Sequence, residues 1–252
     1  MPISYASLKR AIRPFRKTGR TLWQAPMPET PDKTTSLVFV HIGKSGGESL
    51  WQAINDSEIV RSRFDHLERV HVRQPRILKN AQYLIVVRNP ISRTVSAFNW
   101  RYRLVVEDSA KRLHVPGEYE ILVKYGTLNA LAEALFSNDT LDQHVASDFR
   151  KIHHLREDIS FYLADLLSNI SAEQIFGVMT TEHLNSCIAD VLGVQDIKKT
   201  HENKSATKPK NLELSDTATR NLRRFLDPDY VVLDRLLRLK PIPENQRNAL
   251  LK

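Results

Sequence analysis

The sequence contains one cysteine, Cys187, and only 8 glycines among its 252 residues. A single cysteine cannot form a disulfide within the chain, and it disfavours a metal site built from thiolates. Its helical surroundings predict a small buried side chain. The N-terminus lacks the apolar core of a signal peptide, and no apolar stretch approaches the length of a membrane span. We therefore expect a protein of the reducing, cytoplasmic interior of a cell.

The charge is unbalanced, with 37 basic residues against 29 acidic ones and a formal net charge of +8. Much of the excess lies within the first twenty residues, ahead of Pro26, Pro28 and Pro31. We expect residues 1–33 to form a basic arm and linker, and residues 34–252 to form one α/β domain. The positive charge favours an anionic ligand. The arm is either a solvated tail or a contact for a membrane surface or partner.

Hydrophobic periodicity predicts strands that alternate with helices. Apolar runs predict buried strands over Ser36–His41, Gln82–Val87 and Gln174–Met179. Helices are predicted over Ser49–Asn55, from Pro90 onward, and over Leu128–Phe136, Asp158–Leu167, Glu182–Leu192, Ser215–Leu226 and Tyr230–Leu239. The polar segment Asp56–Asn80 predicts a loop with a short helix. This order favours a three-layer sandwich in which helices flank a central parallel sheet.

The segment Phe39–Leu50 reads FVHIGKSGGESL and predicts a strand, a glycine turn and a helix. A helix start offers unpaired N–H donors and the positive end of a dipole. The paired glycines Gly46 and Gly47 let a ligand approach the backbone closely. With Lys44 and two hydroxyls beside it, this P-loop-like turn is predicted to hold a phosphate or a sulfate.

A second strand, turn and helix is predicted in Val87–Phe98, which reads VRNPISRTVSAF. Arg88 stands at the carboxyl end of a buried strand, where open parallel sheets bind their ligands. Ser92 and Ser96 are four residues apart and share a helix face. The alternative is that Arg88 caps a carbonyl and the serines face solvent. Two such sites in one domain favour a single ligand with two separated phosphates.

Hydrolysis of ATP or GTP is disfavoured by what the glycine turn lacks. A Walker A loop needs a glycine five positions before its Gly-Lys-Ser, and here that position holds Val38. The later strand ends also carry no clear aspartate to hold magnesium.

Both motifs resemble those of the sulfotransferases that use 3′-phosphoadenosine 5′-phosphosulfate (PAPS), in the branch of the carbohydrate sulfotransferases and their bacterial relatives. That family's motifs, FVHIPKTGGTSL and VR[DN]PxxRxxSAF, align without gaps over Phe39–Leu50 and Val87–Phe98. The resemblance covers roughly residues 35–240. It implies a glycan or small-molecule acceptor, and neither nucleic acid nor a metal. It also implies a cofactor site at Lys44, Ser45, Gly46, Gly47, Glu48 and Ser49 for the phosphosulfate, at Arg88 and Ser96 for the 3′-phosphate, and at Lys204 in a basic loop.

The sequence departs from the family pattern at three positions: Gly43 replaces proline, Ser45 replaces threonine, and Glu48 replaces threonine or serine. Only the last one changes the chemistry, because a carboxylate beside a phosphate opposes binding unless it points away or pairs with a cation. Glu48 is therefore either a neutralised neighbour of the cofactor or a group on the acceptor side, including a base.

Sulfuryl transfer needs a group that stabilises the leaving phosphate and a base for the acceptor proton. The resemblance assigns the first role to Lys44. Histidine is the usual base near neutral pH. His71 ranks first because it lies between the two motifs, and His66 ranks second. His41 is expected to make a structural hydrogen bond, and His154 either packs in the core or lines an acceptor cleft.

Two other functions stay open at this point. A P-loop kinase of nucleotides or small molecules predicts ATP binding that depends on magnesium. A non-catalytic protein that binds polyanions predicts strong salt dependence, and its function would survive Lys44→Ala.

Overall fold

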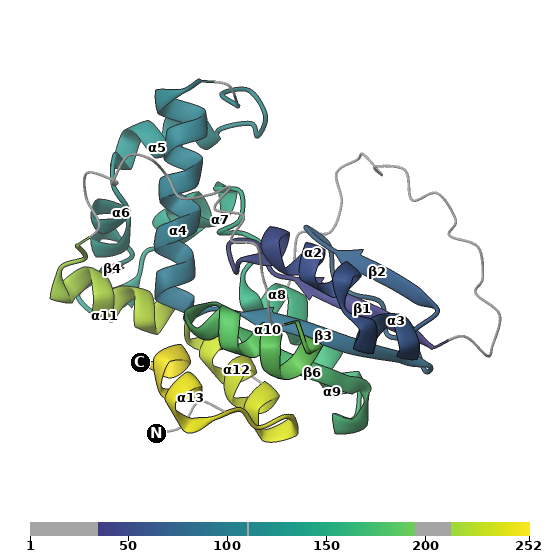
Figure 1. The fold of residues 1–252 in the computed structure, drawn as a ribbon. Helices are drawn as coiled ribbons and strands as arrows, with labels where there is room; N and C mark the ends of the chain where they lie inside the picture. Colours follow the sequence, from purple (N-terminus) through teal and green to yellow (C-terminus); the bar gives the residue numbers. More distant parts are fainter. Residues whose placement is uncertain (1–34, 110, 195–212) are drawn as a thin grey trace. The chain divides into compact units, whose positions relative to one another are not determined.

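The computed structural model describes residues 35–109, 111–194 and 213–252. The predicted arm at residues 1–33 and Lys204 lie outside them. Four parallel strands form the central sheet in the order β2-β1-β3-β6 (Figure 1). They are β1 (Ser36–His41), β2 (His66–Val70), β3 (Ala81–Val87) and β6 (Ile175–Thr180). Because Val40 pairs with Val70, and Val87 with Thr180, the carboxyl ends of the strands meet at one edge.

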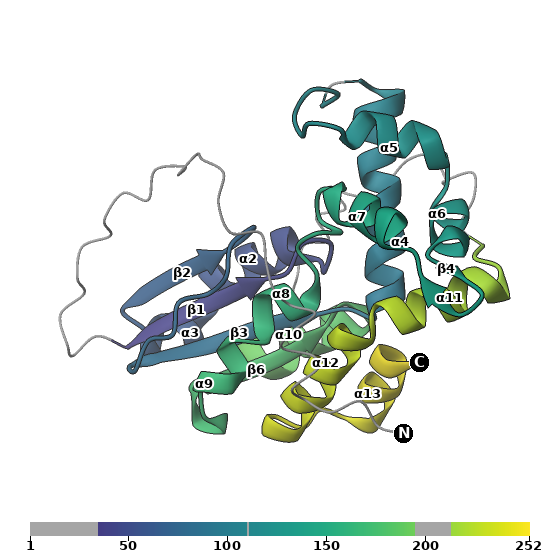
Figure 2. The same ribbon diagram turned by 180° about the vertical axis from the view of Figure 1, so that it is seen from behind.

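Helices cover both faces of this sheet, which confirms the predicted α/β layering. Side chains alternate along β1, so Val38 packs in a core with residues of α8, α9, α12 and α13. Its neighbour Phe39 packs in a second core with residues of α2, α3 and α10. The strand is buried on both sides, and this explains its unbroken apolar run. Figure 2 shows α8 and α9 on the face opposite α10.

A third core lies beside the sheet, around helix α4 (Figure 1). It joins α4 to α5, α6, α7 and α11, with Phe98, Leu131, Phe149 and Leu222 fully or almost fully buried. The described α-helices are α2 (Gly47–Asp56), α3 (Glu58–Arg63), α4 (Pro90–Tyr102), α5 (Glu118–Tyr125), α6 (Leu128–Ala134), α7 (Gln143–Lys151), α8 (Ile159–Leu163), α9 (Leu166–Asn169), α10 (Leu184–Leu192), α11 (Asp216–Phe225), α12 (Asp227–Leu239) and α13 (Glu244–Leu251).

Short elements complete the chain. A π-helix, η1 (Arg103–Glu107), continues α4, and single 3₁₀ turns lie at η2 (Ala172–Gln174) and η3 (Thr181–His183). The strands β4 (Phe136–Ser137) and β5 (Thr140–Leu141) form a hairpin. Asn138 and Asp139 connect them with positive φ angles of 48° and 61°, as a type I′ turn requires. None of the helices in the described ranges is long and apolar enough to cross a membrane.

Three sequence predictions need correction. The segment Asp56–Asn80 contains strand β2 as well as the short helix α3. The helix predicted over Asp158–Leu167 is two helices, α8 and α9, and the one over Leu128–Phe136 ends at Ala134. The start of α4 was predicted correctly, since Asn89 caps it by accepting a hydrogen bond from the Ser92 N–H, and Pro90 is its first residue.

Candidate anion-binding site

The turn between β1 and α2 lies at the carboxyl edge of the sheet. Lys44 and Gly46 both have left-handed backbone conformations, with φ angles of 70° and 75°. Gly46 is the N-cap of α2, and among the described residues no side chain caps this helix. Gly46 is also exposed, so solvent or a ligand reaches the start of the helix. The positive end of the α2 dipole is thus open to an anion, as the sequence predicted.

Two other glycines in the turn give room to histidine rings. A Cβ atom on Gly47 would lie 1.8 Å from Cδ2 of His41, and one on Gly43 would lie 2.5 Å from Nδ1 of His154. Side chains do not tolerate such contacts, so either ring would have to move. The glycines therefore fix the turn against two imidazoles that come from different parts of the chain.

Lys44 carries a positive charge that the fold leaves poorly compensated. Burial, and then the guanidinium groups of Arg88, Arg103 and Arg93 in that order of effect, together lower the pKa of the Lys44 ammonium to about 8. The Nζ atom lies 4.5 Å from the ring centroid of Trp100, a cation–π contact. An anion bound at the turn would relieve this repulsion and favour the charged amine.

Two arginines from the second motif reach the same turn in different ways. Arg88, at the end of β3, donates a hydrogen bond to the Lys44 carbonyl oxygen at 3.2 Å. Burial lowers the pKa of Arg88, and the carboxylate of Glu182 partly opposes this. Arg93 is buried in α4 and donates to the carbonyl oxygen of Gly43 at 3.0 Å, and to those of His154 and Glu157. Arg93 thus holds the turn in place, whereas Arg88 borders it.

Ser45 supplies an unused hydroxyl in this turn. Its side chain is fully buried, and its Oγ atom has no hydrogen-bond partner among the described residues. A buried polar atom without a partner is costly and calls for an explanation such as an absent ligand. Ser96, predicted to bind a phosphate, is half-buried on α4, on the helix face that also carries Arg93 and Trp100.

The histidines gather beside the turn. The His41 Nδ1 atom accepts from Arg69 at 2.8 Å, since an arginine can only donate, and this confirms the expected structural hydrogen bond. His71 follows β2 directly and stacks on His41, with ring centroids 4.4 Å apart. The His71 Nδ1 atom lies 3.1 Å from the His41 carbonyl oxygen. Since a carbonyl only accepts, Nδ1 carries the proton, and the Nε2 atom of neutral His71 is a free base.

His154 and Trp100 extend this group. The His154 ring lies 5.6 Å from His71 and 5.2 Å from Trp100, measured between centroids. Burial, and then the neighbouring His153, lower the pKa of His154 to about 2, so its ring is neutral. The sequence left His154 between core packing and the acceptor side. His154 is buried and Trp100 is half-buried directly beneath the Lys44 amine.

Not every predicted site residue joins this group. His66 pairs with Ser36 at the amino end of the sheet, four residues before the end of β2, and it is exposed. The structure therefore does not bring His66 to the turn. Glu48 and Ser49 lie in the first turn of α2, and their side chains lie outside the described residues, as does Lys204. Cys187 is buried, as the sequence predicted, and its Sγ–H group donates a hydrogen bond to the side-chain oxygen of Gln246 at 3.4 Å.

A group of possible metal ligands, His153, His154 and Glu157, lies next to the turn. Its geometry does not suit a metal ion. The two imidazoles stack at 4.1 Å with 30° between their planes, whereas a shared metal must lie near the plane of each ring. The Glu157 oxygens also already accept from the His154 N–H and from Arg156. We assign this group to the packing of the loop.

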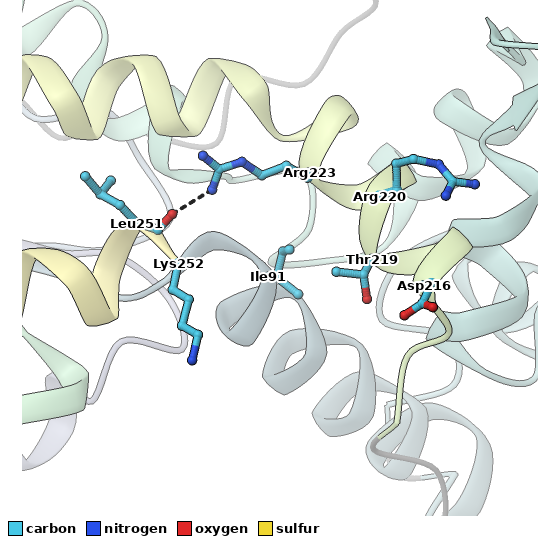
Figure 3. A pocket seen from close by; sticks show the side chains of 7 residues that line it. All are labelled: Ile91, Asp216, Thr219, Arg220, Arg223, Leu251 and Lys252. Carbon is cyan, nitrogen blue, oxygen red and sulfur yellow. Dashed lines mark hydrogen bonds between the residues drawn. The ribbon is translucent and has the colours of Figure 1, made fainter.

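A pocket of about 500 Å³ opens elsewhere, where the start of α4 meets α11 and the end of α13 (Figure 3). It is lined by Ile91, Asp216, Thr219, Arg220, Arg223, Leu251 and Lys252. Arg223 is held by the Leu251 carbonyl oxygen at 2.9 Å. Neither Lys44 nor Arg88 lines this pocket, so the candidate site lies outside it.

Comparisons with protein-family models, with curated proteins and with solved structures found no match for this chain.

Proposed function

We propose that the chain is a sulfotransferase with a P-loop-like fold that moves the sulfuryl group of PAPS to a hydroxyl, or less readily an amine, of a carbohydrate or small molecule. One observation carries the proposal. Lys44 lies next to a helix start that no described side chain caps, and burial, followed by the charges of Arg88, Arg103 and Arg93, lowers its pKa to about 8. A site with this excess of positive charge is built for an anion.

The two motifs would divide the nucleotide between them. The phosphosulfate would lie on the N–H groups of the glycine turn and the Ser45 hydroxyl, which has no partner among the described residues. Its bridging oxygen, where negative charge builds as the S–O bond breaks, would face the Lys44 ammonium. The 3′-phosphate would lie with Arg88 and Ser96 at the start of α4, where a guanidinium binds phosphate in bidentate fashion.

His71 is the proposed base. Its Nδ1 proton is held by the His41 carbonyl oxygen, so Nε2 is available for the proton of the acceptor hydroxyl. As the acceptor oxygen forms its bond to sulfur, that proton passes to Nε2. Adenosine 3′,5′-bisphosphate leaves with the electrons of the broken S–O bond, and no metal takes part.

The residues around the glycine turn give less support to a kinase with a magnesium site. Val38 stands within β1, fully enclosed, where a Walker loop has its first glycine. Glu182, the carboxylate beside Arg88, already accepts a hydrogen bond from the Asn89 N–H at 2.9 Å. This leaves it poorly placed to hold a magnesium ion.

Nucleotide binding tests the proposal first. We expect adenosine 3′,5′-bisphosphate without magnesium to raise the melting temperature, and ATP with magnesium to raise it much less. Lys44→Ala should abolish most turnover, and Lys79→Ala, which removes an exposed lysine ahead of β3, should not. Transfer is followed with labelled PAPS on a panel of glycans and alcohols. Equal stabilisation by ATP with magnesium would favour the kinase instead.

A pair of histidine variants tests the base. His71→Asn keeps a donor for the His41 carbonyl but removes Nε2, and we expect a loss of about 10²–10⁴-fold in kcat. His66→Asn is the matched control, since His66 lies at the opposite edge of the sheet, and it should retain full activity. Equal losses in the two variants, or none in His71→Asn, would rule out His71 as the base.

A further inference from the structure

The Lys44 amine is held by an aromatic ring and not by a hydrogen bond. Its Nζ atom lies 4.5 Å from the ring centroid of Trp100, which is half-buried in the last turn of α4. Among the described residues, no oxygen accepts a hydrogen bond from this amine and no carboxylate pairs with it. An ammonium that is partly buried is ordinarily paired or hydrogen-bonded. Its three N–H donors are therefore available to a ligand.

Trp100 is itself fixed by neighbours that belong to the fold. Its ring lies 5.2 Å from the His154 ring, measured between centroids, and 5.4 Å from the guanidinium carbon of Arg101. Arg101 is buried and donates two hydrogen bonds to the carboxylate of Glu118, which is fully buried. The ring that contacts Lys44 thus rests on residues that are already satisfied within the protein.

The surroundings of Lys44 add positive charge and take none away. The described charges that act on it are guanidinium groups from three elements: Arg88 after β3, Arg93 in α4 and Arg103 in η1. His154 lies beside it with a neutral ring, and the His71 ring lies 5.6 Å beyond that of His154. A carboxylate at the place of Trp100 would hold the amine but would cancel the charge that an anion needs. An aromatic face attracts an ammonium and adds no formal charge.

We propose, on the basis of the sulfotransferase function above, that Trp100 is the positioning residue of Lys44: its ring keeps the ammonium at the glycine turn, unneutralised, for the leaving phosphate. A lysine side chain is long and flexible. The backbone of Lys44 is fixed by Arg88, which donates to its carbonyl oxygen at 3.2 Å, and the amine at the other end is fixed by Trp100. Without the ring, repulsion from the arginines would drive the ammonium away from the turn.

Fluorination of the Trp100 ring tests this role with little change of shape. Fluorine withdraws electrons from the ring face and so weakens its attraction for a cation. The test replaces Trp100 by tryptophan with one, two or three fluorine atoms and measures affinity for adenosine 3′,5′-bisphosphate against pH by calorimetry. The pH above which affinity falls, about 8 in the wild type, should move down stepwise, by about 0.5–1 pH unit in total. The same series at Trp51, which stacks on Phe39, is the control and should leave the profile unchanged.

A second measurement detects the contact in the free protein, without any nucleotide. With ¹³C-labelled lysine, the ring current of Trp100 should shift the Lys44 Hε resonances away from those of the exposed Lys79. Trp100→Leu should abolish this shift. It should also lower turnover of labelled PAPS by up to about 10²-fold, since a misplacement of about 1 Å has such an effect. Tyr102→Leu, which removes a nearby ring that stacks on Phe98, should change neither.

The outcomes separate the two proposals. If the wild-type protein binds the bisphosphate but fluorination at Trp100 leaves the pH profile unchanged, the role of Trp100 is refuted and the sulfotransferase proposal stands. The same conclusion follows if free protein shows no ring-current shift at Lys44, or if the Trp51 series moves the profile as far. If the wild-type protein does not bind the bisphosphate, the sulfotransferase proposal fails, and the role of Trp100 in transfer fails with it. A stepwise change confined to Trp100 supports the role.

Discussion

A buried pair of carboxyl groups under the sheet makes a prediction about stability that does not depend on the function. Asp229, in the first turn of α12, accepts from the Ser160 N–H at 2.7 Å, and its other oxygen has no hydrogen-bond partner among the described residues. Burial, and then the charge of Asp158, raise the pKa of Asp229 from 3.8 to about 8. Burial raises the pKa of Asp158 as well. The folded protein therefore holds a proton here at neutral pH.

The sign of the effect follows from proton binding. Between about pH 4 and pH 8 the folded state keeps this proton and the unfolded state releases it, so stability falls as the pH rises. The slope is about 1.4 kcal/mol per pH unit while the folded group stays protonated. With a folded pKa of about 8, the loss from pH 6 to pH 8 is about 2 kcal/mol.

Asp229→Asn removes this pH-dependent contribution to the free energy of unfolding. It keeps the shape of the side chain and an oxygen that accepts from the Ser160 N–H. We expect the stability advantage of the variant over the wild type to grow by about 2 kcal/mol from pH 6 to pH 8, which is about 4–8 °C in melting temperature for a chain of this size. Urea unfolding at the two pH values measures the difference. Asp227→Asn, at an exposed position of the same helix turn, keeps Asp229 and should therefore keep the pH profile of the wild type. Parallel pH profiles for wild type and Asp229→Asn would refute the reasoning.

Three further predictions concern the site and its support. Gly47→Ala should destabilise the fold by about 1–3 kcal/mol, measured by urea unfolding, because its Cβ would overlap His41; an unchanged midpoint would contradict this packing. Bisphosphate affinity, measured by calorimetry, should fall up to tenfold per pH unit above about pH 8 as Lys44 loses its proton, and Lys44→Arg should flatten the profile. Arg101→Gln should cost about 3–5 kcal/mol of unfolding free energy, because it leaves Glu118 buried without its charge partner; a loss below 1 kcal/mol would show that solvent reaches the pair.

The strands that the sequence predicted are those enclosed on both faces. β1, β3 and β6 are almost fully buried, and their residues read as continuous apolar runs. β2 was missed because it lies at the edge of the sheet, where His66–Val70 is mostly half-exposed and reads HLERV. A polar strand of this kind has no period that distinguishes it from a loop.

The candidate site also contains residues whose positions were predictable from the sequence and residues whose positions were not. The turn at Lys44 and the arginine at Arg88 were predictable, because the carboxyl ends of adjacent parallel strands must meet at one edge. The approach of His154 was not predictable, since it depends on Arg93, which donates to the carbonyl oxygens of Gly43, 50 residues before it, and of His154, 61 residues after it. Hydrogen bonds to backbone carbonyls leave no trace in residue type, so sequence patterns cannot report them.

Asn89 couples the second motif to the far end of the chain. While its side-chain oxygen caps α4, its amide donates to the Leu250 carbonyl oxygen, 161 residues further along. During synthesis on a ribosome, the start of α4 therefore cannot reach its final geometry until α13 has emerged from the exit tunnel. The glycine turn can take its final geometry before then, because its described partners Arg93 and His154 both come earlier in the chain than α13. The glycine turn and the segment of Arg88, which together form the proposed nucleotide site, would then reach their final structures at different times.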